Sequence, residues 1–158
     1  MKEIERKFLV DRYKLMDDIR TINIIDKFNI EQGYLCKDDG ITVRIRIQNT
    51  TGFITIKGKT KNISRDEYEF EIPIQDAKDL LKMCDKTIIK ERFVIEYCEK
   101  HWYVDIFDGE NKGLIVAEIE LKNEDEEFLS PSWLIKEVSD DARYYNSNLI
   151  NHPYNTWQ

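Results

Sequence analysis

Residues 66–72 read DEYEFEI, in which three glutamates alternate with Tyr68, Phe70 and Ile72. Residues two apart on a β-strand share a face, so this stretch predicts a strand with one acidic and one apolar face. Residues 41–48, ITVRIRIQ, alternate in the same way but carry arginines on the polar face. Strands with one charged and one apolar face therefore decide the fold class.

The same alternation recurs along the chain and predicts eight strands. We expect them at residues 3–10, 22–35, 41–48, 53–58, 66–74, 87–96, 101–107 and 114–121. Apolar residues at helical spacing predict helices at 13–20 and 76–84, and residues 124–158 are expected to form one or two short helices on the outside. The predicted class is α+β, mainly β.

The apolar side chains of these strands are expected to be buried. The face on which they are buried determines the direction in which the charged face points. The apolar residues are Ile4, Phe8, Val43, Ile45, Ile54, Ile56, Phe70, Ile72, Ile89, Phe93, Ile106, Ile119 and Leu121. One charged pair alone is typical of a solvated face, but here the pattern repeats on most strands. If helices cover the apolar face, we expect an eight-stranded antiparallel β tunnel, closed or nearly closed as a barrel, with a charged lumen and helices packed outside.

Length and composition limit the class of protein. The 158 residues suit one domain over residues 1–158, and no apolar run approaches the roughly 20 residues of a membrane span. The charged N-terminus differs from a secretory signal, so a cytoplasmic location is expected. The net charge of −7 argues against nucleic-acid and membrane-surface binding. Cys36, Cys84 and Cys98 lack disulfide or zinc spacing and are expected to be reduced thiols.

Charged residues of both signs fall on the predicted lumen face, and crowding them there is costly without a ligand. The basic set suits phosphate oxygens and comprises Lys7, Arg44, Arg46, Lys57, Lys90 and Arg92. The acidic set comprises Glu3, Glu5, Glu69, Glu71, Asp105, Glu118 and Glu120. Carboxylates alone would repel a polyphosphate, but Mg²⁺ or Mn²⁺ can bridge them to it. The sequence therefore predicts a metal-dependent site for a polyphosphate-like anion.

The order of these motifs resembles the CYTH domains of the triphosphate tunnel metalloenzyme superfamily. The N-terminal ExExK signature stands here as Glu3-Ile4-Glu5-Arg6-Lys7. It is followed by 32–35 (QGYL), 43–46 (VRIR), 55–57 (TIK), 69–71 (EFE), 90–92 (KER), 104–107 (VDIF), 113–114 (GL), 117–121 (AEIEL) and 137–139 (EVS). Nearly the whole chain is covered, and about nine elements in order are more specific than ExExK alone.

The resemblance implies roles for individual residues. Glu3, Glu5 and Glu120 would bind a metal on the triphosphate, while Glu69, Glu71, Asp105 and Glu118 would bind a second metal or orient basic neighbours. The six basic residues would grip phosphates, with Lys7, Glu5 and Glu120 at the catalytic centre. The substrate would be a small-molecule triphosphate, and a homodimer is compatible with the family.

The leading functional hypothesis is hydrolysis of inorganic triphosphate to orthophosphate and pyrophosphate by a metal-activated water. Alternatives within the family are a thiamine triphosphatase and a class IV type adenylate cyclase. Outside it, the alternatives are a non-catalytic polyphosphate- or nucleotide-binding module and a purely structural barrel.

Several other residues are given structural interpretations. We expect Arg65, Lys136 and Arg143 to form ordinary surface pairs, although each could touch an outer phosphate. Tyr34 is expected to be a packed tyrosine, with support of a catalytic lysine as the alternative. The aromatic residues Trp102, Trp133, Tyr144, Tyr145 and Trp157 are interpreted as packing residues rather than a nucleobase platform.

Overall fold

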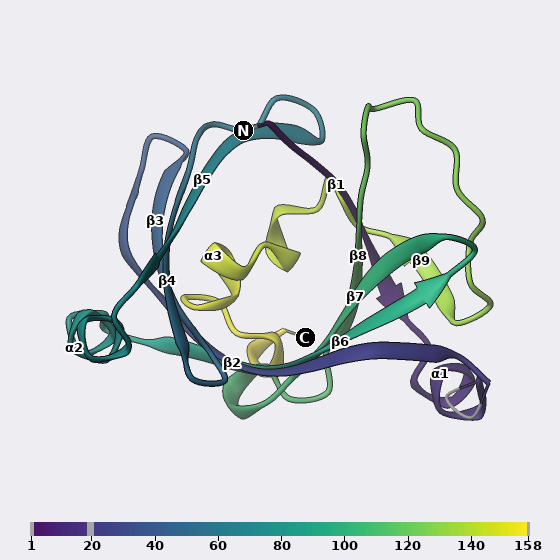
Figure 1. The fold of residues 1–158 in the computed structure, drawn as a ribbon, viewed down its shortest axis with the longest axis horizontal. Coiled ribbons are helices and arrows are strands. Elements are labelled where there is room, and N and C mark those ends of the chain that lie inside the picture. Colours follow the sequence, from purple (N-terminus) through teal and green to yellow (C-terminus); the bar gives the residue numbers. More distant parts are fainter. Residues whose placement is uncertain (1, 19–20, 158) are drawn as a thin grey trace.

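The computed structural model describes residues 2–18 and 21–157, and strands dominate it (Figure 1). The described strands are β1 (Lys2–Val10), β2 (Asn23–Asp38), β3 (Ile41–Gln48), β4 (Thr51–Lys57), β5 (Ser64–Ile72), β6 (Thr87–Tyr97), β7 (Lys100–Phe107), β8 (Ile115–Glu120) and β9 (Leu134–Glu137). The first eight match the predicted strands to within a few residues. The short β9 has no counterpart in the sequence analysis.

Strands β1–β8 close into an antiparallel barrel. The hydrogen-bonded order is β5-β4-β3-β2-β6-β7-β8-β1-β9, and β1 also pairs with β5. Strand β1 makes the closure because its first residues pair with β5, with Glu3 opposite Arg65, and its other edge pairs with β8. The last residues of β1 pair with β9. The predicted eight-stranded tunnel is confirmed (Figure 1).

Two helices pack against the outside of the barrel, as predicted. Helix α1 (Arg12–Asp18) follows β1, and α2 (Ile74–Lys82) lies against the outer face of the sheet with Ala77 and Leu81 buried. The final two residues of the helix predicted at 13–20 lie outside the described residues. No helix in the described ranges is long and apolar enough to cross a membrane.

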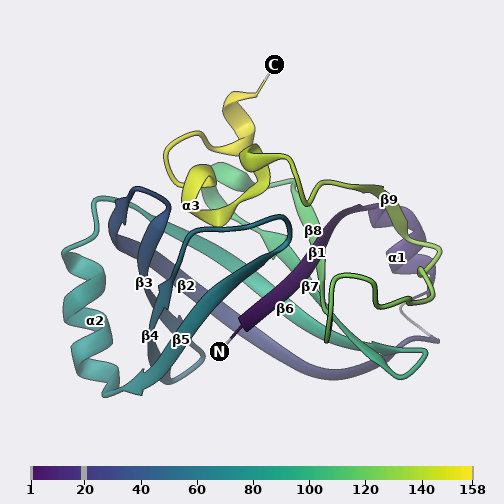
Figure 2. The ribbon, with the colours of Figure 1, turned by 90° about the horizontal axis from the view of Figure 1, so that it is seen from above.

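The C-terminal segment lies across one opening of the barrel. It contains the 3₁₀ turn η2 (Ala142–Tyr144), helix α3 (Asn146–Leu149) and the 3₁₀ turn η3 (Tyr154–Thr156); a further turn, η1 (Gly109–Asn111), precedes β8. In Figure 1, α3 is seen inside the outline of the ring, and in Figure 2 it lies above the barrel. These elements are outside the wall, as expected, but they cover an end of the tunnel.

Apolar residues of the outer face are buried only where a helix or another chain segment packs against them. The largest cluster contains Trp102 and Trp133, 0% and 1% exposed, together with Ile4, Phe8 and Ile119. The expectation that every outer apolar residue is buried was wrong for three residues. Ile56, Phe70 and Ile89 are exposed, because α2 covers only part of the outer wall.

Candidate active site

The tunnel contains a cavity of about 300 Å³ lined mainly by charged side chains. Eleven of the predicted site residues line it: Glu3, Glu5, Lys7, Arg44, Arg46, Lys57, Glu69, Lys90, Arg92, Glu118 and Glu120. Of the other two, Asp105 is buried directly behind the lining and Glu71 is exposed on β5. The alternation in the sequence thus brings nearly the whole predicted set together.

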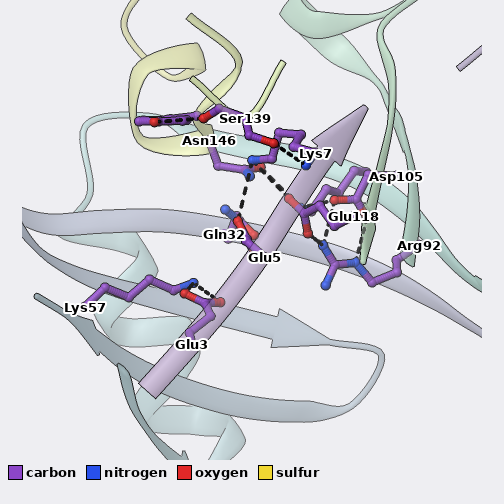
Figure 3. A network of polar contacts seen from close by, with 12 residues as sticks. Glu3, Glu5, Lys7, Gln32, Lys57, Arg92, Asp105, Glu118, Ser139 and Asn146 are labelled. Atoms are coloured by element: carbon purple, nitrogen blue, oxygen red, sulfur yellow. Dashed lines mark hydrogen bonds and ion pairs between the residues drawn. The ribbon is translucent and has the colours of Figure 1, made fainter. Parts of the chain in front are cut away.

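Asp105 is the buried counterion of two basic residues. Its Oδ2 accepts a hydrogen bond from Lys90 Nζ at 2.6 Å. Its two oxygens also accept hydrogen bonds from Arg92 Nε and Nη2 at 2.6 and 2.7 Å (Figure 3). Burial raises the pKa of Asp105, but the two cations outweigh burial and lower it. Burial lowers the pKa of Lys90 to about 8. Both Asp105 oxygens are therefore engaged by basic neighbours.

Glu118 links Arg92 to Lys7. It lies 2.8 Å from Arg92 Nη2 and 3.1 Å from Lys7 Nζ. Although burial opposes ionisation, Lys7 and Arg92 hold the pKa of Glu118 well below its usual range. The carboxylate is therefore ionised and serves the two cations.

A second ion-pair cluster surrounds Glu3. Lys57 Nζ donates to its Oε1 at 2.8 Å, and Arg65 Nε donates to its Oε2 at 2.8 Å (Figure 3 shows the first pair). Lys57 Nζ also lies 2.6 Å from Glu67. Both Glu3 oxygens are therefore paired with cationic side chains, and a metal ion could bind Glu3 only by displacing Lys57 or Arg65.

Arg44 and Arg46 extend side by side from β3 and share one carboxylate. Their Nη2 atoms lie 3.2 and 2.9 Å from Glu69, which also accepts a hydrogen bond from Thr55. The Nε atoms of both arginines are buried without a hydrogen-bond partner within the described residues. Burial and the neighbouring Arg44 lower the pKa of Arg46 to about 10. Unused donors and mutual repulsion favour binding of an additional anion here.

Glu5 and Glu120 differ from the other carboxylates of the cavity. They are directly opposite each other on β1 and β8. The nearest cationic atoms to Glu5, on Lys7 and Arg65, are each 3.9 Å away. The pKa of Glu5 is raised by burial and then by Glu118, and that of Glu120 by burial and then by Glu3 and Glu5. A cation between Glu5 and Glu120 would relieve this repulsion.

A complete metal cage is not preformed. Among the described residues, no three Asp, Glu, His or Cys side chains are close enough to hold an ion by themselves. Mg²⁺ commonly binds one or two carboxylates and takes its other oxygens from water and substrate phosphates. The Glu5–Glu120 pair fits a hard divalent cation of this kind.

The structure adds site residues that sequence reasoning missed. Arg65, interpreted as a surface residue, points into the cavity, and Glu67 lines it with the same alternation as Glu69. Arg143 does form the expected exposed surface pair, with Asp141 at 2.6 Å. Lys136 is exposed and outside the cavity lining.

Three tyrosines also line the cavity: Tyr34, Tyr103 and Tyr145. Tyr34 accepts a hydrogen bond from Gln32 Nε2 at 3.3 Å, and burial raises the pKa of its phenol. The ring of Tyr145 lies 5.7 Å from Lys7 Nζ, so its interpretation as a plain packing residue is incomplete. Trp102 and Trp133 pack in the core as predicted.

Fold and cavity together define a class of protein: a closed β tunnel whose lumen is lined by charged side chains of both signs. The sequence profile of the CYTH domain matches residues 1–150. A relative named inorganic triphosphatase, from Acetivibrio thermocellus, is 41% identical over 99% of this chain and 98% of its own. Another of the same name, from Nitrosomonas europaea, is 32% identical over 94% and 97%. The chain therefore belongs to the CYTH domain family, whose triphosphate tunnel metalloenzymes are metal-dependent.

Solved structures agree with this assignment. The crystal structure of the inorganic triphosphatase NE1496 matches with a TM-score of 0.66 and 31% identity, covering 94% of this chain and 97% of that chain. The resemblance noted from the sequence is thus confirmed.

Proposed function

We propose that the protein is a metal-dependent hydrolase that splits inorganic triphosphate into orthophosphate and pyrophosphate. One observation carries the proposal: the same cavity holds an arginine pair with unused donors and the opposed carboxylates Glu5 and Glu120, with the nearest cationic atoms to Glu5 as far as 3.9 Å away. The first suits phosphate oxygens and the second suits a cation. The names of the two relatives support the same activity.

Glu5 and Glu120 are the proposed cation ligands, with Mg²⁺ or Mn²⁺ as the ion. Glu3 joins them if phosphate oxygens take over its partners Lys57 and Arg65. When bound, the ion would neutralise phosphate charge and lower the pKa of the attacking water. Glu69, Asp105 and Glu118 have the role of orienting basic neighbours rather than ligating this ion. Glu71, which is exposed on β5 and outside the cavity lining, is assigned neither role.

The basic residues hold the triphosphate and stabilise charge on the departing pyrophosphate. Arg44 and Arg46 bind from β3, and Lys7, only 5% exposed, binds from β1. Lys57, Lys90 and Arg92 contribute from β4 and β6. Water attacks a terminal phosphorus, the bond from that phosphorus to the bridging oxygen breaks, and pyrophosphate leaves with the bond's electron pair. The proton released from the attacking water passes to a phosphate oxygen of the products or to solvent.

The test is phosphate release from tripolyphosphate, ATP and thiamine triphosphate, each with Mg²⁺, Mn²⁺ or EDTA. We expect the fastest release from tripolyphosphate and none in EDTA. Glu5→Gln and Glu120→Gln should each lower kcat by at least roughly 100-fold, because each removes a cation ligand. Glu91→Gln neutralises a carboxylate on the outer face of β6 and is the matched control.

The result that would overturn the proposal is cyclic AMP as the main product from ATP, or faster turnover of thiamine triphosphate than of tripolyphosphate. Tight metal-dependent binding without turnover would indicate a binding module. One domain over residues 1–158, a cytoplasmic location and a homodimer belong to the same proposal. Light scattering during size-exclusion chromatography tests the dimer.

A further inference from the structure

The C-terminal segment contributes side chains to the cavity as well as covering it. Tyr145, Asn146 and Ser147 are part of the lining at the end where α3 crosses the barrel (Figures 1 and 2). Leu149, 0% exposed, anchors the segment in an apolar cluster with Phe107. The covered end is therefore packed in place rather than loosely overlaid.

Two consecutive residues of this segment contact two lysines from different strands. Asn146 Oδ1 accepts a hydrogen bond from Lys90 Nζ at 3.1 Å, and the Tyr145 ring lies 5.7 Å from Lys7 Nζ, within cation–π range. Figure 3 shows Asn146 beside the lumen with Lys7 on β1 nearby. Both ammonium groups are thus approached from the covered end of the tunnel.

Ser139 fixes the position of Tyr145 relative to β1. Its Oγ accepts a hydrogen bond from the backbone N–H of Lys7 at 2.9 Å, and its carbonyl accepts one from the Tyr145 hydroxyl at 3.1 Å. Its Oγ also donates to Glu137 Oε1 at 2.7 Å. These hydrogen bonds therefore fix the C-terminal segment against β1 at the point where the Lys7 side chain enters the cavity.

We propose that Tyr145 and Asn146 form an end stop that sets the position of the phosphate chain in the tunnel. The inference rests on the proposed hydrolysis of triphosphate. A lysine ammonium has three N–H donors, and Lys90 uses one for Asp105 and one for Asn146, which leaves one to bind a terminal phosphate. The Asn146 side chain blocks further travel, so only one anhydride bond of the chain lies at the site of attack.

The products formed from tetrapolyphosphate show which anhydride bond lies at the site of attack. Water attack on a terminal phosphorus gives orthophosphate and tripolyphosphate, whereas attack at the central anhydride gives two pyrophosphates. We expect the wild-type protein to give the first pair at early times. Asn146→Ala should let the chain slide and raise the share of pyrophosphate among the initial products at least fivefold, with KM for tripolyphosphate increased about tenfold by the lost support of Lys90. Ion chromatography of the products measures both.

Three further variants sharpen the test. Asn146→Gln reaches further into the lumen and should keep the wild-type product pair while lowering kcat/KM for tetrapolyphosphate more than for tripolyphosphate. Asn151→Ala makes the same truncation at an exposed position of the segment and should match the wild type. Tyr145→Phe keeps the ring but loses its bond to Ser139, and should shift the products in the same direction as Asn146→Ala, to a smaller extent.

The outcomes separate the two proposals. If the wild type does not hydrolyse tripolyphosphate, the proposed function fails first. If it does, then an unchanged product ratio in folded Asn146→Ala and Tyr145→Phe overturns the end stop, as does an equal shift in Asn151→Ala. Should Asn146→Ala not fold, Asn146→Ser shortens the same side chain and decides the question in its place.

Discussion

Asp105 illustrates how individual charges depend on one another in this lumen. It is 1% exposed and neutralises both Lys90 and Arg92. Breaking a buried ion pair from one side leaves an uncompensated charge, which is more costly than replacing the whole pair.

Asp105→Asn should therefore destabilise the protein by about 3–5 kcal/mol, because two buried cations lose their shared counterion. Urea unfolding followed by circular dichroism measures the change. Asp108→Asn, at an exposed position in the turn after β7, is the matched control and should cost under about 0.5 kcal/mol. A loss below about 1 kcal/mol in Asp105→Asn would contradict the assigned role.

Neutralising Glu5 should stabilise the metal-free protein, in contrast to neutralising Asp105. Burial and Glu118 raise the pKa of Glu5 above the unfolded value. The stability that a raised pKa provides is present below the unfolded pKa and is lost as pH rises through the folded pKa. Glu5→Gln removes the ionised form, so Tm should rise by about 2–4 °C at pH 8 and change less at pH 4.

Differential scanning fluorimetry in EDTA measures this pH dependence. Glu91→Gln, on the outer face, should show no such difference between the two pH values. A lower Tm for Glu5→Gln at pH 8 would mean that the carboxylate is paired in the folded protein.

At the scale of elements, α2 depends on glycine for its close approach to the sheet. A Cβ built on Gly52 of β4 would lie 2.5 Å from the Ala77 Cβ of α2. Ala77 is fully buried, so neither partner has room to move.

Gly52→Ala should therefore cost about 1–3 kcal/mol by forcing α2 away from the barrel. Gly58→Ala is the matched control, because its Cβ would meet its nearest neighbour at an ordinary 3.7 Å. Equal stability of the two variants in thermal unfolding would show that α2 tolerates displacement.

The same scale shows what the sequence could predict. Alternation of charged and apolar residues located β1–β8 and most of the lumen, because period two fixes the facing of a strand. It could not locate β9, which has four residues, or the contact of Asn146 with Lys90, which joins positions far apart in sequence. Arg65 and Arg143 each have an acidic residue two positions away in the sequence, Glu67 and Asp141, so sequence spacing could not distinguish the lumen arginine from the surface arginine.

At the scale of the molecule, the barrel holds its charges so that ligand and metal depend on each other. Basic residues repel a free cation, and the carboxylates repel a free triphosphate. Closure of β1 against both β5 and β8 brings Glu3 and Glu5 to Arg65, sets Glu5 opposite Glu120, and keeps the two sets in one cavity. Binding of each ligand should therefore strengthen binding of the other, to the same degree in both directions.

This coupling gives a last prediction for thermal stability. Mg²⁺ alone at a few millimolar should raise Tm by less than about 1 °C. The reason is that Glu5 and Glu120 are the only proposed protein ligands available to it and no metal cage is preformed among the described residues. Mg²⁺ with a non-hydrolysable triphosphate analogue at 100 times its Kd should raise Tm by roughly 5–10 °C. In the Glu5→Gln variant the analogue should raise Tm by the same small amount with Mg²⁺ as with EDTA. The variant has lost a cation ligand, whereas the basic residues that bind the analogue remain. If Mg²⁺ alone stabilised the wild type as much as both ligands together, the ion would have a preformed site and the mutual dependence would be wrong.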